Sequence, residues 1–140
     1  MCGILPILDE QAAYNLTQHK YSGSDEGIFY TYCWNPFATK MVCYLPDWIA
    51  PNTLTLLGFM HTVVPFLILF YVSGFDLLGD IPNWFCFLQA YSFFAYRMLD
   101  EMDGKQARRT GNSSPLGLMF DHGCDAFTTV LQALISLRTV

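Results

Sequence analysis

Hydrophobic residues are concentrated in three long runs in the second part of the chain, with short polar segments between them. The first run extends from Leu54 to Val72, and its one strongly polar side chain is His61, which we expect to be a packed or hydrogen-bonded interior histidine and not a ligand. At about 1.5 Å per residue, a helix of this length crosses a hydrocarbon core of roughly 30 Å. The pattern predicts three transmembrane helices, at about 54–72, 83–101 and 116–138.

Prolines indicate where the first of these helices begins and where it bends. Pro51-Asn52-Thr53 is typical of a helix start, with Asn52 or Thr53 as the predicted N-cap. Pro65 lies inside the run and predicts a kink, because proline removes a backbone hydrogen bond.

The first 50 residues lack any run of the roughly 20 apolar residues that a membrane span needs. Their most apolar part, 28–37, interleaves aromatic and polar side chains, a mixture that suits the membrane interface. We therefore predict two regions, an amphipathic interfacial arm over 1–50 and a membrane domain over 51–140. The alternative is a soluble arm that packs on a core of its own.

Composition supports a membrane protein with few spans. Hydrophobic residues make up 53% of the chain and charged residues only 14%, which leaves too little polar surface for an ordinary small globule. The formal net charge of -5 argues against nucleic acid as a partner, since proteins that bind a phosphate backbone are usually basic. The five cysteines are an odd number with no metal-ligand spacing, so reduced, scattered thiols are expected.

Charge also predicts the orientation in the membrane. Basic residues flank spans on the cytoplasmic side, so Lys105, Arg108 and Arg109 predict a cytosolic loop over 104–116. The acidic connector 73–82 would lie on the opposite side, and the N-terminal arm would be cytosolic. The sequence thus predicts an all-α, multi-pass membrane protein.

The segment 100–125 places four aspartates beside strongly apolar sequence, where charge is costly and indicates function. Asp100 and Asp103 are three residues apart and Asp121 and Asp125 are four apart, so on helices each pair shares a face. If the two helices lie side by side, the four carboxylates converge and need cations to stay ionised. Hard divalent ions with oxygen ligands fit, and Mg²⁺, Mn²⁺ and Ca²⁺ are the candidates.

Other residues of the same segment suit a ligand that contains phosphate. Gly104 and Gly117 have no side chains and let a ligand approach the backbone. Arg108 can hydrogen-bond phosphate oxygens in a fork. Lys105 and Arg109 would either do the same or only mark the cytosolic boundary.

A general base is also available in this segment. His122 is the candidate, because imidazole groups in general titrate near neutral pH and can accept a proton from a hydroxyl nucleophile. Asp125 is the alternative base, although a carboxylate bound to a cation is a weaker one. Cys124 lies on a different helical face from His122, which disfavours a zinc site.

The spacing Asp-x2-Asp-Gly-x2-Ala-Arg-x8-Gly-x3-Asp-x3-Asp resembles the signature of the CDP-alcohol phosphotransferase family. It is met without a gap by Asp100, Asp103, Gly104, Ala107, Arg108, Gly117, Asp121 and Asp125. The stretches 103–109, 120–125 and 46–52 are similar to the eukaryotic choline/ethanolamine phosphotransferase branch. The resemblance covers roughly residues 18–130.

The resemblance implies transfer of phosphocholine or phosphoethanolamine from CDP-choline or CDP-ethanolamine to diacylglycerol, with release of CMP. It implies two Mg²⁺ or Mn²⁺ ions, with Asp121 as their bridge, and His122 as the proton acceptor. The ligands of these ions would be Asp100, Asp103, Asp121 and Asp125. The residues that contact or make room for the CDP-alcohol would be Asn52, Gly104, Arg108 and Gly117.

The same resemblance implies an endoplasmic reticulum or Golgi membrane, with the active site facing the cytosol, and we expect a homodimer. Leu118 departs from the branch, which usually has glutamate there. Family members have about six core spans, so we expect this chain to be the N-terminal part of a larger helical bundle, or a truncated form. The alternative function is a catalytically incomplete membrane partner of a full-length subunit. An Asp-rich prenyltransferase fits the Gly-x2-Ala-Arg element poorly.

Overall fold

The computed structural model describes residues 9–18, 26–74 and 80–139, and the regular structure within them is entirely helical. Three long helices account for most of it, and shorter helical segments precede them. In chain order the elements are α1 (Glu10–Gln18), the π-helical turn η1 (Tyr30–Trp34), α2 (Asn35–Cys43), α3 (Pro51–Ser73), α4 (Asn83–Thr110) and α5 (Pro115–Thr139).

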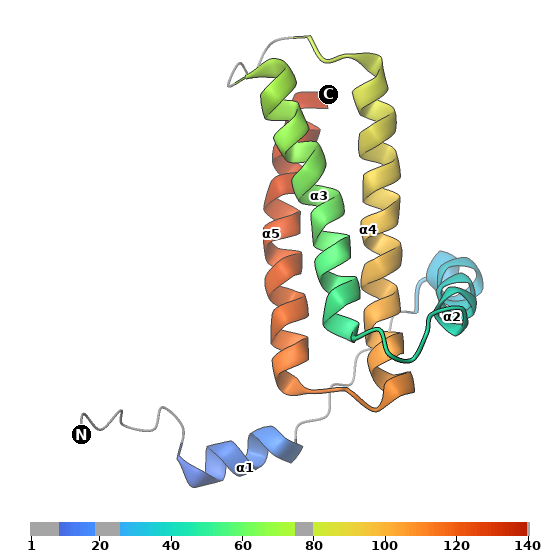
Figure 1. Ribbon diagram of the computed structural model, residues 1–140, viewed down its shortest axis with the longest axis vertical. Helices are drawn as coiled ribbons and strands as arrows, with labels where there is room; N and C mark the ends of the chain where they lie inside the picture. Colours follow the sequence, from blue (N-terminus) through green and yellow to red (C-terminus); the bar gives the residue numbers. More distant parts are fainter. Residues whose placement is uncertain (1–8, 19–25, 75–79, 140) are drawn as a thin grey trace.

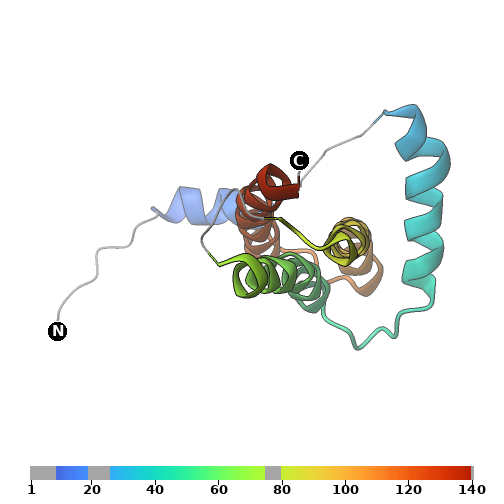
Figure 2. The same ribbon diagram turned by 90° about the horizontal axis from the view of Figure 1, so that it is seen from above.

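The three long helices form a bundle in which α3 packs against both α4 and α5 (Figures 1 and 2). The continuous η1–α2 arm runs across the bundle axis, beside the C-terminal half of α4 (Figure 2). The helix α1 lies beyond the end of the bundle where α4 turns into α5 (Figure 1). This end, which we call the turn end, holds the residues of the 100–125 segment.

The structure places the start of α3 differently from the sequence prediction. Ala50 is the extended residue that precedes the helix, and Pro51 is its first residue. Proline disfavours a helical conformation in the residue before it and fits the first helical position itself. Asn52 and Thr53 therefore lie inside the first turn and cap nothing, so the N-cap prediction was wrong. Pro65 is buried within a continuous helix.

The predicted loop over 104–116 was also wrong, because α4 continues to Thr110. Gly111 ends it with a φ of +70°, a left-handed conformation that glycine adopts without steric cost. Ser114 then caps α5, since its Oγ accepts a hydrogen bond from the Gly117 N–H at 3.0 Å. The connection is therefore only 111–114, and it holds the last turns of α4 close to the first turns of α5.

Apolar side chains are buried at two levels of the bundle. Near the turn end, Ala38 and Val42 of the arm pack against Leu54, Met98 and Met102. Near the other end, Leu69, Phe85 and Ile135 form a second cluster. Between α3 and α4, Gly58 allows a close approach, because a Cβ there would lie 3.4 Å from Leu99 Cβ.

Many large apolar side chains of the long helices face outward, including Tyr71, Phe87, Phe127 and Leu137. Such a surface suits contact with lipid better than contact with water. Among the described helices, α3 alone combines the length and the hydropathy of a complete membrane span. The helices α4 and α5 carry ionisable residues of the 97–125 region and do not meet the same test.

The cysteines in the described residues, Cys33, Cys43, Cys86 and Cys124, are all free thiols, as predicted. Cys2 lies outside the described residues, as does part of the acidic connector 73–82.

Candidate active site at the turn end

The turn end of the bundle brings the four aspartates of the 100–125 segment together. Asp100 and Asp103 come from α4, while Asp121 and Asp125 come from the antiparallel helix α5. The carboxyl groups meet in pairs across the two helices, Asp100 with Asp125 and Asp103 with Asp121, within hydrogen-bonding reach. Asp100 and Asp103 are three residues apart and Asp121 and Asp125 are four apart, so both aspartates of each helix lie on its inner face.

Three of these carboxylates are each held by a neighbouring donor. Arg97 Nη1 lies 2.7 Å from Asp100 Oδ2. The Thr55 hydroxyl, which is buried on α3, donates to Asp103 Oδ2 at 2.5 Å. The Tyr96 hydroxyl donates to Asp125 Oδ1 at 2.9 Å.

Asp121 is different, because its Oδ1 is buried without a hydrogen-bond partner among the described residues. A buried, unpaired carboxylate oxygen is costly and needs an explanation. Burial also raises the pKa of Asp103 to about 8; the Thr55 hydrogen bond opposes this rise, and the carboxylates of Asp121 and Asp100 add to it. The cluster therefore has more negative charge than the protein compensates, and its oxygen ligands fit a hard divalent cation.

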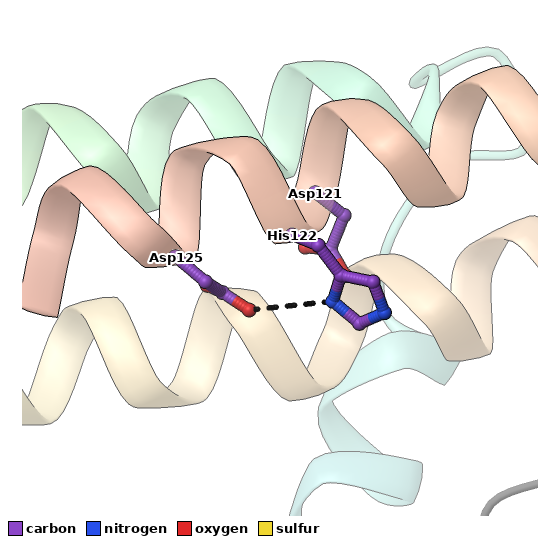
Figure 3. Close-up of side chains that lie close together, drawn as sticks. All are labelled: Asp121, His122 and Asp125. Atoms are coloured by element: carbon purple, nitrogen blue, oxygen red, sulfur yellow. Dashed lines mark ion pairs between the residues drawn. The ribbon is translucent and has the colours of Figure 1, made fainter.

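His122 lies on α5 next to Asp121, with its ring turned toward the carboxyl group of Asp125 (Figure 3). Its Nδ1 is 3.9 Å from Asp125 Oδ2 and 3.9 Å from Asp121 Oδ2. The imidazole is exposed, whereas both carboxylates are half-buried. Asp121, His122 and Asp125 can also place one ligand atom each around a common point.

A half-open cavity of about 490 Å³ adjoins two of the four carboxylates. Asp103 and Asp121 form part of its wall, and His122, Asp100 and Asp125 do not line it. The four residues that the sequence assigned to the CDP-alcohol all line it, from the first turns of α3 and α5 and the last turns of α4: Asn52, Gly104, Arg108 and Gly117.

The missing side chain at Gly117 matters to the shape of this cavity. A Cβ at Gly117 would lie 3.2 Å from Ser114 Oγ and 3.5 Å from Asn52 Oδ1. A side chain at 117 would therefore press on the Ser114 hydroxyl that caps α5 and would touch the Asn52 amide. At Gly104, a Cβ would come within 3.6 Å of the Arg108 guanidinium, which is an ordinary contact.

Two of the basic residues lie elsewhere. Lys105 pairs with Glu101 at 3.0 Å and donates to Asn35 Oδ1 at 2.5 Å, so it contacts the η1–α2 arm. Arg109 binds carbonyl groups at the end of α2 and the carboxylate of Asp47. The sequence left two roles open for Lys105 and Arg109, phosphate contact or marking of the cytosolic boundary. Phosphate contact has no support in their geometry, because neither residue lines the cavity.

Sequence reasoning gave no role to Thr55 and Tyr96, the donors to Asp103 and Asp125. Tyr96 lies four residues before Asp100, on the same face of α4, and that spacing was a usable signal. Thr55 lies on another helix, and nothing in its local sequence relates it to Asp103.

Residues 48–140 match the family described as CDP-alcohol phosphatidyltransferase. The match covers more than half of the chain and includes the whole carboxylate cluster and the cavity walls from α3, α4 and α5. The chain belongs to the CDP-alcohol phosphatidyltransferase family.

Relatives of this family member include Cholinephosphotransferase 1 of Danio rerio, which is 45% identical over 122 residues, 85% of this chain and 31% of the relative. Choline/ethanolaminephosphotransferase 1 of Arabidopsis thaliana is 44% identical over 85% of the chain and 30% of the relative. An uncharacterised family member of Dictyostelium discoideum is 40% identical over 92% of the chain and 32% of its own length. The chain thus spans about a third of the relatives that it matches.

Proposed function

We propose that the chain carries the site for a divalent-metal-dependent transfer of a phosphoalcohol group from a CDP-alcohol to a lipid hydroxyl. The observation that supports this most is the carboxylate cluster of Asp100, Asp103, Asp121 and Asp125 directly beside the cavity. The names of the relatives point to CDP-choline or CDP-ethanolamine as the donor. Diacylglycerol is the acceptor that we propose, and phosphatidylcholine or phosphatidylethanolamine the product.

In this proposal the CDP-alcohol lies in the cavity, with its diphosphate toward Asp103 and Asp121. Arg108 is exposed in the cavity wall and would hydrogen-bond the phosphate oxygens. Asn52, whose side-chain amide lies beside Gly117, would donate its amide N–H groups to the ligand. Asp100, Asp103, Asp121 and Asp125 would hold two Mg²⁺ or Mn²⁺ ions, with the unpaired Oδ1 of Asp121 favouring that residue as the bridge. Bound divalent ions would neutralise charge on the transferred phosphoryl group.

His122 is the base in this proposal, because its exposed imidazole lies 3.9 Å from Asp121, a residue of the cavity wall, and a carboxylate that holds a cation is a weaker base. A hydroxyl group beside His122 would attack a phosphorus atom that is held next to Asp121. The new bond joins the lipid oxygen to the β-phosphorus, the bond to the CMP oxygen breaks, and CMP leaves with its electron pair. The hydroxyl proton passes to an imidazole nitrogen. Asp125 stays the alternative base, and the carboxylate of Asp125 beside the ring would stabilise the imidazolium.

We propose that α3, α4 and α5 all cross the membrane, with the turn end at the cytosolic surface. The outward-facing apolar side chains of the three helices support this placement. The η1–α2 arm lies across the bundle axis with Phe29 and Tyr32 exposed, and Trp48 is exposed in the segment that joins α2 to α3, which suits a position at the interface. The ionisable residues of the 97–125 region would then lie in the cytosolic half of α4 and α5, and Arg138 would lie at the opposite end of α5.

The test uses the 140-residue chain in vesicles that contain diacylglycerol, with CDP-choline and Mg²⁺. We expect Mg²⁺-dependent binding of CDP-choline and formation of phosphatidylcholine and CMP. His122→Ala should lower transfer by roughly 100-fold or more while binding of CDP-choline and Mn²⁺ persists. Near-normal turnover of His122→Ala would indicate that Asp125, and not His122, is the base.

The same experiment distinguishes the proposed function from the alternative function. Absence of Mg²⁺-dependent CDP-choline binding would contradict the proposed function. Binding without transfer would favour the alternative, in which the chain is a membrane partner that needs a full-length subunit.

A further inference from the structure

The last three turns of α4 have two polar faces, and the candidate site uses only one of them. Asp103 and Arg108 face the cavity. Gln106 and Arg109 face the opposite way, toward the segment 44–50 that joins α2 to α3. The side chain of Gln106 is fully buried, with an exposed fraction of 0%. A buried amide in this position needs a reason, because burial of an amide without partners is costly.

Both side chains bind backbone carbonyl groups of the chain that leads into α3. Gln106 Nε2 donates to the carbonyl groups of Pro46 and Ile49, each at 3.1 Å. Arg109 Nη1 donates to the Val42 carbonyl at 2.6 Å, and its Nη2 donates to the Leu45 carbonyl.

The Asp47 carboxylate adds an ion pair at 2.8 Å from Arg109 Nη2. The Asp47 side chain is exposed, so we expect the carbonyl contacts to contribute more than this ion pair to holding the segment 44–50 against α4. We call Gln106 and Arg109 the latch, and 44–50 the latched segment.

The latched segment ends directly before the cavity wall. Ile49 is three residues from Asn52, and Ala50 is the extended residue directly before α3. A chain this short cannot move at one end without moving the other. The first turn of α3 then places Asn52 against Gly117 and, one turn later, Thr55 against Asp103. The latch thus fixes the wall of the cavity relative to the helix that carries the carboxylates.

We propose that Gln106 and Arg109 are positioning residues, which hold the segment 44–50 against α4 and so set the distance between Asn52 and the Asp103–Arg108 face. Neither residue contacts the cavity. The identity of the ligand in this inference rests on the proposed function, whereas the mechanical role of the latch does not.

The test compares Gln106→Met and Arg109→Met with the wild-type chain in lipid nanodiscs. Both changes keep a long side chain and remove the donors. Amide hydrogen exchange should become faster at 44–53 and stay unchanged in the centre of α4. The Kd for CDP-choline in the presence of Mg²⁺ should rise about 10-fold, the effect of losing one or two charge-assisted or buried hydrogen bonds. The Kd for Mn²⁺ should change less than about twofold, since Asp103 and Asp121 keep their places.

Lys105→Met is the matched control. Lys105 is also a basic residue of α4, but it contacts Asn35 and Glu101 and not the latched segment. It should speed up exchange in the η1–α2 arm alone and leave the Kd for CDP-choline within about twofold. Arg109→Lys keeps a charged donor for the carbonyl groups and should restore part of the affinity, which a purely steric role of Arg109 would not predict.

Each result decides the inference. Unchanged exchange at 44–53 in both methionine variants would overturn the latch, as would faster exchange without any change in the Kd for CDP-choline. If the wild-type chain bound no CDP-choline, the proposed function would fail, and hydrogen exchange would still decide whether Gln106 and Arg109 hold the segment. If either methionine variant did not fold, Arg109→Lys would give the same two measurements.

Discussion

Two clusters of buried polar side chains lie at different levels of the same three helices, and they differ in how their groups are paired. In the middle of the bundle, Gln132 of α5 donates to the Thr62 hydroxyl of α3 at 3.2 Å, and Gln89 of α4 donates to the Gln132 carbonyl oxygen. All of these groups are neutral. At the turn end, four carboxylates share a small volume, with one donor each for Asp100, Asp103 and Asp125.

The difference shows how a functional cluster can be told from a structural one inside a bundle. The neutral cluster of Thr62, Gln89 and Gln132, which we call the neutral relay, connects α3, α4 and α5 by hydrogen bonds. Its one unpaired acceptor is the Gln89 side-chain oxygen, and burial of this oxygen without a partner costs only about 1–3 kcal/mol. The turn end has excess negative charge and a buried, unpaired oxygen on Asp121. Excess charge of this kind is compatible with folding when a cation binds, which supports the proposed cation at the turn end, whereas the relay has no charge to compensate.

The largest effect is expected from Asp121→Asn. The change keeps the shape of the side chain and removes one charge from the cluster. Mn²⁺ affinity should fall by more than the roughly 10- to 100-fold that is typical for losing a partner of a metal ligand. Electron paramagnetic resonance of Mn²⁺, or calorimetry with Mg²⁺, measures it. Because less charge remains to be compensated, the metal-free variant should be at least as stable as the wild type. Unchanged Mn²⁺ affinity would contradict the placement of the cation at Asp121.

A smaller effect is expected from Thr55→Val, which removes the donor to Asp103 and keeps the size of the side chain. The Asp103 carboxylate would lose its fixed orientation, so Mn²⁺ affinity should fall about 10-fold. Thr55→Ser keeps the hydroxyl and should bind Mn²⁺ almost as the wild type does. Equal losses in the valine and serine variants would assign the effect to packing of the Thr55 methyl group, not to its hydrogen bond.

Part of the site was predictable from the sequence alone. The spacings of Asp100, Asp103, Asp121 and Asp125 were enough to predict that the two aspartates of each helix share a face, because helical periodicity is local. That the two faces meet was predicted only on the condition that the helices lie side by side. The extension of α4 to Thr110 was missed, since Lys105, Arg108 and Arg109 were interpreted as boundary charges of a loop. Charged residues are good helix formers, and the stop came instead from Gly111.

Contacts between distant segments were beyond reach for a different reason. Gln106 carries no charge and lies in a strongly polar stretch, so its complete burial against the carbonyl groups of Pro46 and Ile49 leaves no local pattern. The same holds for Thr55, which is 48 residues from Asp103. Positions that depend on tertiary packing become visible only when the helices are placed together.

A pH effect of intermediate size distinguishes the charged cluster from the neutral relay. An unfolded aspartate loses its proton near pH 4, whereas Asp103 in the folded, metal-free protein keeps it up to about pH 8. The folded state therefore binds more protons between these values, and the free energy of unfolding should fall as the pH rises from 4 to 8. Asp103 alone would contribute about 1 kcal/mol per pH unit to this slope.

Unfolding by SDS in detergent micelles with EDTA, at pH 5 to 8, measures this slope. With saturating Mg²⁺ the slope should become shallower or reverse, because the bound form needs the ionised carboxylate. Asp103→Asn should make the slope of the metal-free protein shallower. A metal-free wild type whose stability did not change over this range would contradict the raised pKa of Asp103.

The smallest effect is expected from Gln132→Leu, which removes the centre of the neutral relay. Hydrogen bonds between membrane helices contribute about 0.6 kcal/mol on average, and leucine replaces the lost contact with apolar packing. The free energy of unfolding should therefore change by less than about 1 kcal/mol. The Kd values for Mn²⁺ and CDP-choline should stay within about twofold, because Gln132 lies about two helical turns from Asp125. Loss of Mn²⁺ binding in Gln132→Leu would show that the relay sets the position of α5 at the turn end, and the two clusters would then have to be treated as one coupled unit.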